Sequence, residues 1–276
     1  MTTAHLVAAE RRLAAAGIVT AQADVAALAA LCPDDPGAFE ALVDRRAERV
    51  PLTHLLGEVA FRGLTLSVGP GVFSPQPETS SLVAWVVDAV ARASDLLVVD
   101  LCTGAGTVAL ALAHELDRAT VHAVERDRDA LRWTGRNAER RAAAGDSPVT
   151  VHQGDAADCL HELDGLVDVV VSNPPYVASH ETAIPDPEVL RHDPAIALWA
   201  GDDGLDVIRL VERTAARLLK PGGLVAVEHS DRQGASAPLV FADGCWEQVT
   251  DHVDHEGKPR FVTAVRRSSV EQHRAG

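Results

Sequence analysis

A rigid binding corner is predicted at residues 171–177, which read VSNPPYV. Pro174 and Pro175 remove two successive backbone donors and prevent the apolar strand before them from continuing. One interpretation is that the prolines only end an edge strand. The other is that they fix a rigid corner that holds two carbonyl oxygens and the aromatic face of Tyr176 for a substrate.

A second candidate site is the Gly-rich segment at 100–106, which reads DLCTGAG and lies where a predicted strand meets a helix. Gly104 and Gly106 allow the backbone to approach a ligand, and the start of the helix offers unpaired N–H donors. With them we count Asp100 and Thr103 as candidate cofactor-binding residues. Alone the pattern is weak, because a tight turn has the same composition and the G-x-G-x-x-G of dinucleotide enzymes is not matched.

Two acids follow the next two predicted strands. Glu125 could accept hydrogen bonds from both ribose hydroxyls of a nucleoside, and Asp155 could accept one from the exocyclic amine of adenine. Each could instead be a solvated acid at a strand end. Because ligands of open parallel sheets bind at the carboxyl ends of the strands, these acids and the Gly-rich segment are expected at one edge.

The elements that position these residues alternate between strand and helix from Ser74 onward. This alternation predicts right-handed βαβ units, hence an α/β fold with a doubly wound, mostly parallel sheet. The tail, WEQVTDHVD and PRFVTAVRR, is predicted to form a C-terminal antiparallel hairpin. Strands are expected at 96–100, 120–125, 149–153, 167–173 and 224–229, and helices at 105–117, 127–144 and 203–219.

The chain before this region divides into two further parts. Residues 1–56 are rich in Ala, Leu, Arg and Glu at helical spacing, with CPDDPG as an interruption, and predict a small helical domain. Residues 57–75 show alternation and Gly punctuation, which predict a β-hairpin connector. Residues 76–276 then hold the candidate site.

Composition excludes several classes of function. With 276 residues and 47% hydrophobic content, the chain can bury a core. A formal charge of −15 without a basic stripe argues against nucleic acid as a partner. Short apolar runs and an N-terminus unlike a signal peptide favour a cytoplasmic protein that does not enter membranes. The scattered cysteines predict neither disulfides nor zinc, and no metal is expected, even at the His-containing stretch 251–256.

The order of Gly-rich loop, two strand-end acids and NPPY resembles the class I S-adenosylmethionine-dependent methyltransferases. The NPPY tetrapeptide resembles those that methylate a nitrogen conjugated to a π system, as in glutamine, adenine or guanine. The resemblance implies that the Asn173 side-chain carbonyl and the Pro174 backbone carbonyl each accept one N–H of the target. Tyr176 would lie against the target, and no strong base is needed because the proton can leave after the nitrogen becomes positive. Asn173 is also counted among the cofactor-binding residues.

The resemblance extends over nearly the whole chain to the HemK/PrmC family. That family methylates the glutamine side-chain nitrogen of the GGQ motif in peptide chain release factors, which implies a release factor as the partner. It also implies that residues 1–56 recognise the substrate and that 76–276 bind S-adenosylmethionine and catalyse transfer. The matching segments are GEVAFRGLTL at 57–66, PxPET at 75–79, DPAIALxxGxDGL at 193–205 and KPGGLVAVEH at 220–229.

Some positions depart from the family pattern. Gln76 and Ser80 stand where Arg and Glu are usual, His54 where an aromatic residue is common, Cys102 where the first glycine is usual, and Glu125 where Asp is more common. The first two changes bear on which acceptor fits. Three alternative functions therefore stay open: methylation of a small-molecule nitrogen in a biosynthetic pathway, methylation of a DNA or RNA base, and S-adenosylmethionine binding without turnover.

Overall fold

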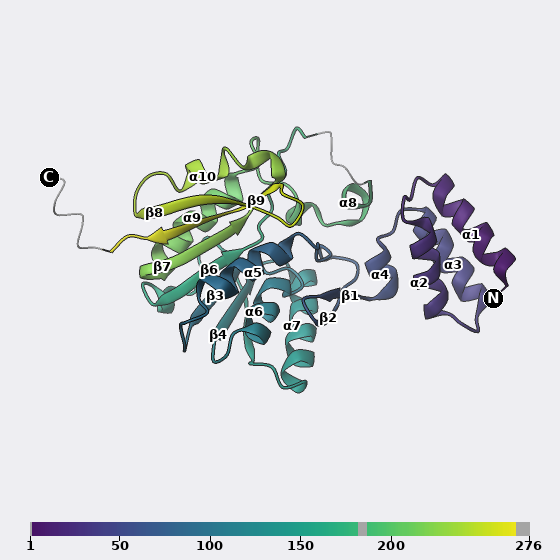
Figure 1. Ribbon diagram of the computed structural model, residues 1–276, viewed down its shortest axis with the longest axis horizontal. Coiled ribbons are helices and arrows are strands. Elements are labelled where there is room, and N and C mark those ends of the chain that lie inside the picture. The colour runs from purple at the N-terminus through teal and green to yellow at the C-terminus, as the bar shows by residue number, and fades with distance from the viewer. Residues whose placement is uncertain (1, 182–186, 269–276) are drawn as a thin grey trace.

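In the computed structural model, which describes residues 2–181 and 187–268, the N-terminal part is helical. The CPDDPG segment interrupts it as predicted, because Pro36 opens a new helix and the Asp35 side chain accepts a hydrogen bond from the Ala38 amide. Apolar side chains of these helices pack on one another, at the end of the molecule away from the sheet (Figure 1). A role in substrate recognition stays a prediction. The helices are α1 (Thr3–Ala15), α2 (Ala21–Leu31), α3 (Pro36–Ala47) and α4 (Leu52–Leu56).

A hairpin of β1 (Glu58–Phe61) and β2 (Leu64–Ser67) connects this part to the rest of the chain. Its two turn residues, Arg62 and Gly63, both have positive φ, which matches the twist of a two-residue hairpin turn. The Arg62 guanidinium pairs with Glu115 at 2.5 Å. The connector is thereby fastened to the larger part of the chain.

Within the described ranges, seven strands form one sheet in the order β5-β4-β3-β6-β7-β9-β8. Strands β3 to β7 are parallel, and β9 runs antiparallel between β7 and β8. The predicted fold class is therefore confirmed: a doubly wound, mostly parallel sheet with a C-terminal antiparallel hairpin. The strands are β3 (Leu97–Leu101), β4 (Thr120–Glu125), β5 (Val149–Gln153), β6 (Val167–Ser172), β7 (Leu219–Glu228), β8 (Trp246–Val253) and β9 (Pro259–Arg266).

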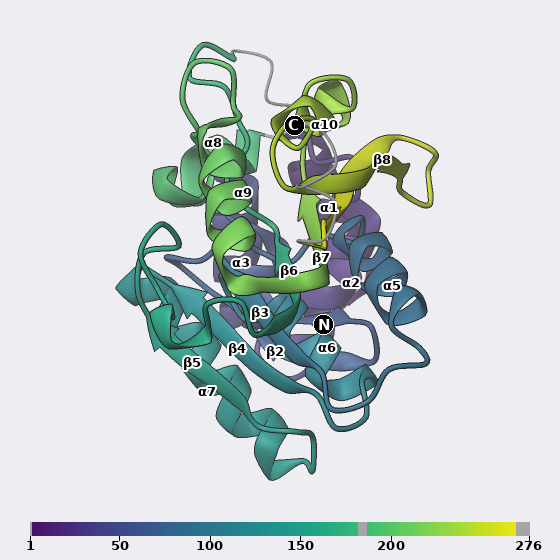
Figure 2. The same cartoon turned by 90° about the vertical axis from the view of Figure 1, so that its left-hand side faces the viewer.

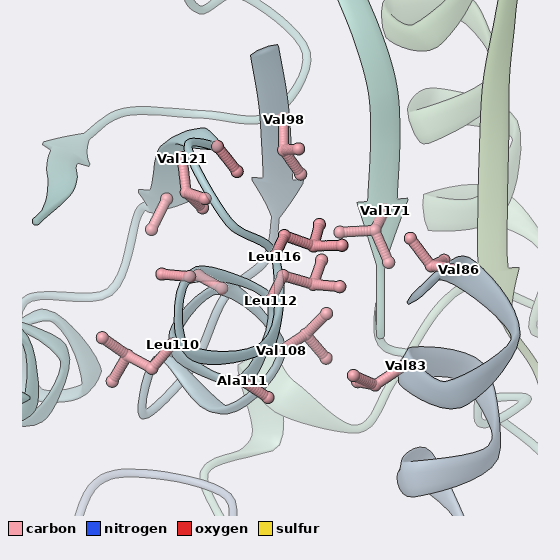
Figure 3. Close-up of a cluster of buried hydrophobic side chains, with 14 of the residues drawn as sticks. Val83, Val86, Val98, Val108, Leu110, Ala111, Leu112, Leu116, Val121 and Val171 are labelled. Atoms are coloured by element: carbon pink, nitrogen blue, oxygen red, sulfur yellow. The ribbon is translucent and has the colours of Figure 1, made fainter. Parts of the chain in front are cut away.

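Helices cover both faces of this sheet, and Figure 2 shows α5 and α9 on opposite sides of β6 and β7. Successive residues of a strand point to opposite faces, so Val98 packs with α5 and α6 (Figure 3) while Val99 packs with α9. The helices are α5 (Thr79–Ala89), α6 (Thr107–Glu115), α7 (Arg128–Ala143), α8 (Pro187–His192), α9 (Asp206–Leu218) and α10 (Ala237–Val240), with 3₁₀ turns at His161–Leu163, Ala195–Ala197 and Asp231–Gln233.

Several element boundaries differ from the predicted ones, and three of these differences have a clear local reason. Helix α6 begins at Thr107 because Gly106 before it is left-handed, and α9 begins after Gly204, which is also left-handed. Strand β7 begins at Leu219 because the KPGG stretch forms a bulge inside it. None of the described helices is long and apolar enough to cross a membrane.

Candidate active site

A cavity of about 480 Å³ opens at the carboxyl ends of the parallel strands, where both halves of the sheet meet. Its lining brings together most of the sequence-predicted residues, namely Asp100, Thr103, Gly104, Glu125, Asp155, Asn173, Pro174, Pro175 and Tyr176. Gly106 is not among the described residues that line it. The segments before α5 and after α8 complete the wall. The NPPY corner and the strand-end acids thus face one space.

The Gly-rich loop between β3 and α6 needs its two glycines for different reasons. Gly104 has φ of 58°, and a Cβ built on it would meet nothing within 4 Å, so its backbone faces open space. Gly106 has φ of 84°, and a Cβ there would come within 3.0 Å of Leu110 and 3.2 Å of Thr134. Gly104 therefore leaves the cavity open, while Gly106 allows the loop to pack on α6 and α7. Cys102 adopts a left-handed φ of 60° without being glycine.

Asp100 is buried at the end of β3, with 1% of its surface exposed. One carboxylate oxygen, Oδ2, accepts hydrogen bonds from the Thr103 hydroxyl at 2.5 Å and the Ala109 amide at 3.0 Å. The other, Oδ1, has no partner among the described residues. Burial raises the pKa of Asp100 to about 7, against the opposing effect of these two bonds. An unpartnered buried carboxylate oxygen in a cavity wall suits a ligand with a cationic or N–H group.

Glu125, at the end of β4, holds the Gly-rich loop in place. Its Oε2 accepts the Gly104 amide at 2.9 Å, and its Oε1 accepts the Asp127 amide at 2.8 Å. Burial raises its pKa, and these backbone hydrogen bonds oppose the rise. Each carboxylate oxygen can accept a further bond, so the side chain keeps capacity for two ligand hydroxyls.

Asp155 stands at the end of β5, next to Glu125 across the sheet edge. It is exposed, accepts the Ala157 amide at 2.9 Å and lies 3.5 Å from the Arg126 guanidinium. The carboxylate is thereby oriented at the mouth of the cavity. Its position fits the predicted hydrogen bond to an exocyclic amine, which stays a prediction.

The NPPY corner follows β6 directly. Ser172 pairs with Val227, so Asn173 comes next to Glu228, the last residue of β7. The Asn173 side-chain amide nitrogen donates to the Thr79 hydroxyl at 3.2 Å, which leaves its carbonyl oxygen available as an acceptor. Tyr176 is half-buried, and burial raises the pKa of its phenol well above the usual range.

Functional candidates that the sequence reasoning missed lie behind this corner. Thr79 is 2% exposed and Glu228 is 1% exposed, and Glu228 Oε2 has no partner among the described residues. Burial raises the pKa of Glu228 to about 7. Arg260 of β9 lines the cavity, and its positive charge opposes the rise in the pKa of Glu228. The available signal was the acid at the end of the strand in VAVEH, the same pattern that pointed to Glu125.

The positions that depart from the family pattern lie in different parts of the structure. Gln76 lines the cavity and donates to the Ser74 carbonyl at 3.0 Å, whereas the Ser80 hydroxyl donates to the Pro77 carbonyl at 2.6 Å. The Arg and Glu that are usual at these two positions would be four residues apart. Because α5 begins only at Thr79, they would not form an i,i+4 pair on one helix. His54 is buried against the Val72 carbonyl at 3.2 Å, and burial lowers its pKa.

The loop that follows the NPPY corner, residues 178–194, is only partly described. Glu181, Val189 and Pro194 line the cavity, while 182–186 lie outside the described residues. In the part of the chain that the structure covers, no three His, Cys, Asp or Glu side chains are grouped so that they could hold a metal ion.

Comparison with known proteins gives several similarities. The family model for the methyltransferase small domain matches residues 63–187. The release factor glutamine methyltransferase of Streptomyces coelicolor is 47% identical over 278 residues, covering 95% of this chain and 96% of that protein. The protein of the same name from Mycolicibacterium smegmatis is 49% identical, covering 94% of this chain and 95% of that one.

Two further similarities are informative. The 4-amino-L-phenylalanine/4-methylamino-L-phenylalanine methyltransferase of Streptomyces pristinaespiralis is 44% identical, covering 78% of this chain and 73% of that protein. A Thermus thermophilus 16S rRNA methyltransferase, solved in complex with AdoMet and guanosine, superposes with a TM-score of 0.54 at 20% identity, covering 76% of this chain and 50% of that one. The last similarity concerns the fold alone.

Proposed function

We propose that this chain, which belongs to the family of release factor glutamine methyltransferases, methylates the glutamine side-chain nitrogen of a peptide chain release factor. The chain is a methyltransferase, and its methyl donor is S-adenosylmethionine. The acceptor is proposed to be the glutamine of the GGQ motif that the resemblance implies. Because release factors act in protein synthesis, the proposal also puts the reaction in the cytoplasm.

The donor half of the site fits this cofactor. Glu125 has the free acceptor capacity to bind two ribose hydroxyls, and Asp155 would accept from the adenine amine. The unpartnered Asp100 oxygen and the open backbone at Gly104 suit the charged methionine end. Bound S-adenosylmethionine supplies an activated methyl group on a sulfonium, which is its own leaving group.

The orientation of the Asn173 side chain is the observation that supports the acceptor half of the proposal. Because its amide nitrogen donates to Thr79, its carbonyl oxygen is left to accept one N–H of the glutamine amide. The Pro174 backbone carbonyl, which cannot rotate freely in the proline pair, would accept the other. Tyr176 lies in the same cavity wall and would pack against the planar amide. Orientation of this kind contributes up to roughly 7–11 kcal/mol in favourable intramolecular models.

Contacts between the N-terminal helices and the cavity region support a part for residues 1–56 in holding the substrate. Arg46 of α3 pairs with Asp24 of α2 and with Glu188 of α8, each at 2.6 Å. Helix α8 borders the cavity, because Val189 is part of its lining. A release factor held against the helices would therefore lie beside the acceptor entrance.

A small aromatic amine is the second candidate acceptor, because one relative at 44% identity is named for two such substrates. The test is a comparison of initial rates of label transfer from labelled S-adenosylmethionine to a release factor and to 4-amino-L-phenylalanine. We expect kcat/KM to favour the release factor by about 100-fold or more, which is about 3 kcal/mol of transition-state discrimination. A release factor whose GGQ glutamine is replaced by alanine is the control, and faster transfer to the amino acid would overturn the proposal.

A further inference from the structure

At the NPPY corner, three side chains from separate elements lie together, and a hydrogen bond joins two of them. Asn173 follows β6, Glu228 ends the neighbouring strand β7, and Thr79 is the first residue of α5. Asn173 donates its amide hydrogen to the Thr79 hydroxyl at 3.2 Å. Both side chains stabilise the charged form of Glu228, whose Oε2 has no hydrogen-bond partner among the described residues. Of the three, only Thr79 and Asn173 reach the cavity wall, so Glu228 lies beneath them.

We propose that Thr79 and Glu228 are positioning residues that fix which way the Asn173 amide faces. This inference rests on the proposed role of Asn173 as the acceptor of a substrate N–H. The side-chain oxygen and nitrogen of asparagine have nearly the same shape but opposite hydrogen-bonding roles. Rotated by half a turn, the residue would present N–H groups to the N–H of the substrate.

The direction of the hydrogen bond between Asn173 and Thr79 follows from the donor and acceptor inventory. In its ionised form the Glu228 carboxylate can only accept, so it attracts the single hydroxyl hydrogen of Thr79. The Thr79 oxygen is then left with lone pairs, and it accepts from the Asn173 nitrogen. A fourth residue, Arg260 of β9, places a positive charge near Glu228 and opposes the cost of burying the carboxylate.

Burial explains why this arrangement can hold one orientation. Thr79 and Glu228 are almost fully buried, so water cannot replace a lost bond cheaply. Their polarity also fits a positioning role, because side chains that only filled the core at these two positions could be apolar. An apolar residue at position 79 would leave an Asn173 N–H unsatisfied and remove the preference for the productive orientation.

The first test compares Thr79→Val, which keeps the shape and removes the hydroxyl, with Thr79→Ser, which keeps the hydroxyl. We expect Thr79→Val to lower kcat about ten-fold or more, with the acceptor KM and the S-adenosylmethionine Kd within about two-fold of wild type. Thr79→Ser should stay within about three-fold of wild-type kcat. Thr263→Val is the matched control, because Thr263 is similarly buried and its hydroxyl bonds to His252 at 2.8 Å, away from Asn173.

Equal kcat for Thr79→Val and wild type would overturn the inference, as would an equal loss in Thr79→Val and Thr79→Ser. Glu228→Gln adds a second arm, because a neutral amide can donate to Thr79 as well as accept from it. We expect it to lower kcat without changing cofactor affinity. A loss of cofactor binding in step with kcat would assign Thr79 and Glu228 to general structure instead.

The last readout needs no acceptor, so it separates this inference from the proposed function. The side-chain amide resonances of Asn173 can be assigned in a ¹⁵N correlation spectrum by their disappearance in Asn173→Ala. We expect these resonances to shift in Thr79→Val and to return near their wild-type positions in Thr79→Ser. Unmoved resonances in Thr79→Val would contradict the inference, even if the wild-type protein methylates no release factor.

Discussion

Replacement of Glu125 by alanine should weaken cofactor binding strongly while leaving the fold intact. In the structure this carboxylate accepts the Gly104 and Asp127 amides, and it is proposed to accept two ribose hydroxyls as well. Glu125→Ala removes the ligand bonds and also releases the Gly-rich loop from its anchor. Affinity for both S-adenosylmethionine and its demethylated product should fall, because both carry the same ribose.

The magnitude follows from the number of bonds. Each hydrogen bond to a charged acceptor is worth about 1.5–3 kcal/mol, so two bonds set an upper limit of about 3–6 kcal/mol. Water entering the vacated space recovers part of this, which leaves an expected loss of about 2–3 kcal/mol. That loss corresponds to a rise in Kd of about 30- to 150-fold.

Isothermal titration calorimetry with both ligands measures this change. Asp168→Ala is the matched control, because the Asp168 side chain also accepts a backbone amide, from Leu97 at 2.8 Å. This bond lies at the amino ends of β6 and β3, away from the cavity. The control variant should leave both Kd values within about two-fold of wild type. An unchanged Kd in a folded Glu125→Ala protein would remove Glu125 from the site.

Three further predictions concern the acceptor side and the buried acids. Asn173→Ala should lower kcat by about two or more orders of magnitude while calorimetry shows S-adenosylmethionine affinity nearly unchanged; lost cofactor binding with an intact fold would refute the acceptor assignment. Gln76→Arg should change the acceptor KM, because Gln76 lines the cavity, whereas Ser80→Glu should not, and neither should change cofactor affinity in the same assays. Asp100 and Glu228 have pKa values raised to about 7, so the folded state binds more protons than the unfolded state, and the free energy of unfolding should fall as pH rises from about 4 to about 7. Urea unfolding at pH 5 and pH 8 should show Glu228→Gln losing less stability over this interval than wild type; an identical pH dependence would contradict the raised pKa of Glu228.

Much of the fold could be predicted from the sequence because its signals are local. Alternating apolar strands and helices predicted the parallel sheet. The strand-end positions of Glu125 and Asp155 predicted that they would lie at one edge with the Gly-rich segment, and all of them line one cavity except Gly106 and other loop residues outside its lining. The bulge in β7 could not be predicted, because KPGG is also typical of a turn after a helix.

The contact between Thr79 and Asn173 could not be predicted from the sequence, for a different reason. Thr79 and Asn173 are 94 residues apart in sequence, and their contact depends on how α5 packs on β7. The sequence predicted a ligand-binding role for Gly106, which stays a prediction, but it could not show that a Cβ at this position would crowd Leu110 and Thr134. A residue type at a turn indicates a conformational need without saying which neighbour imposes it.

The most direct test of the central claim is to locate the transferred methyl group. The protein is incubated with S-adenosylmethionine carrying a deuterated methyl group and an unmodified release factor, and the digested release factor is sequenced by tandem mass spectrometry. The account predicts one labelled methyl group on the side-chain nitrogen of the GGQ glutamine, absent when Asn173→Ala replaces the wild-type protein. Label on any other residue, or none on the release factor while 4-amino-L-phenylalanine is methylated, would contradict it.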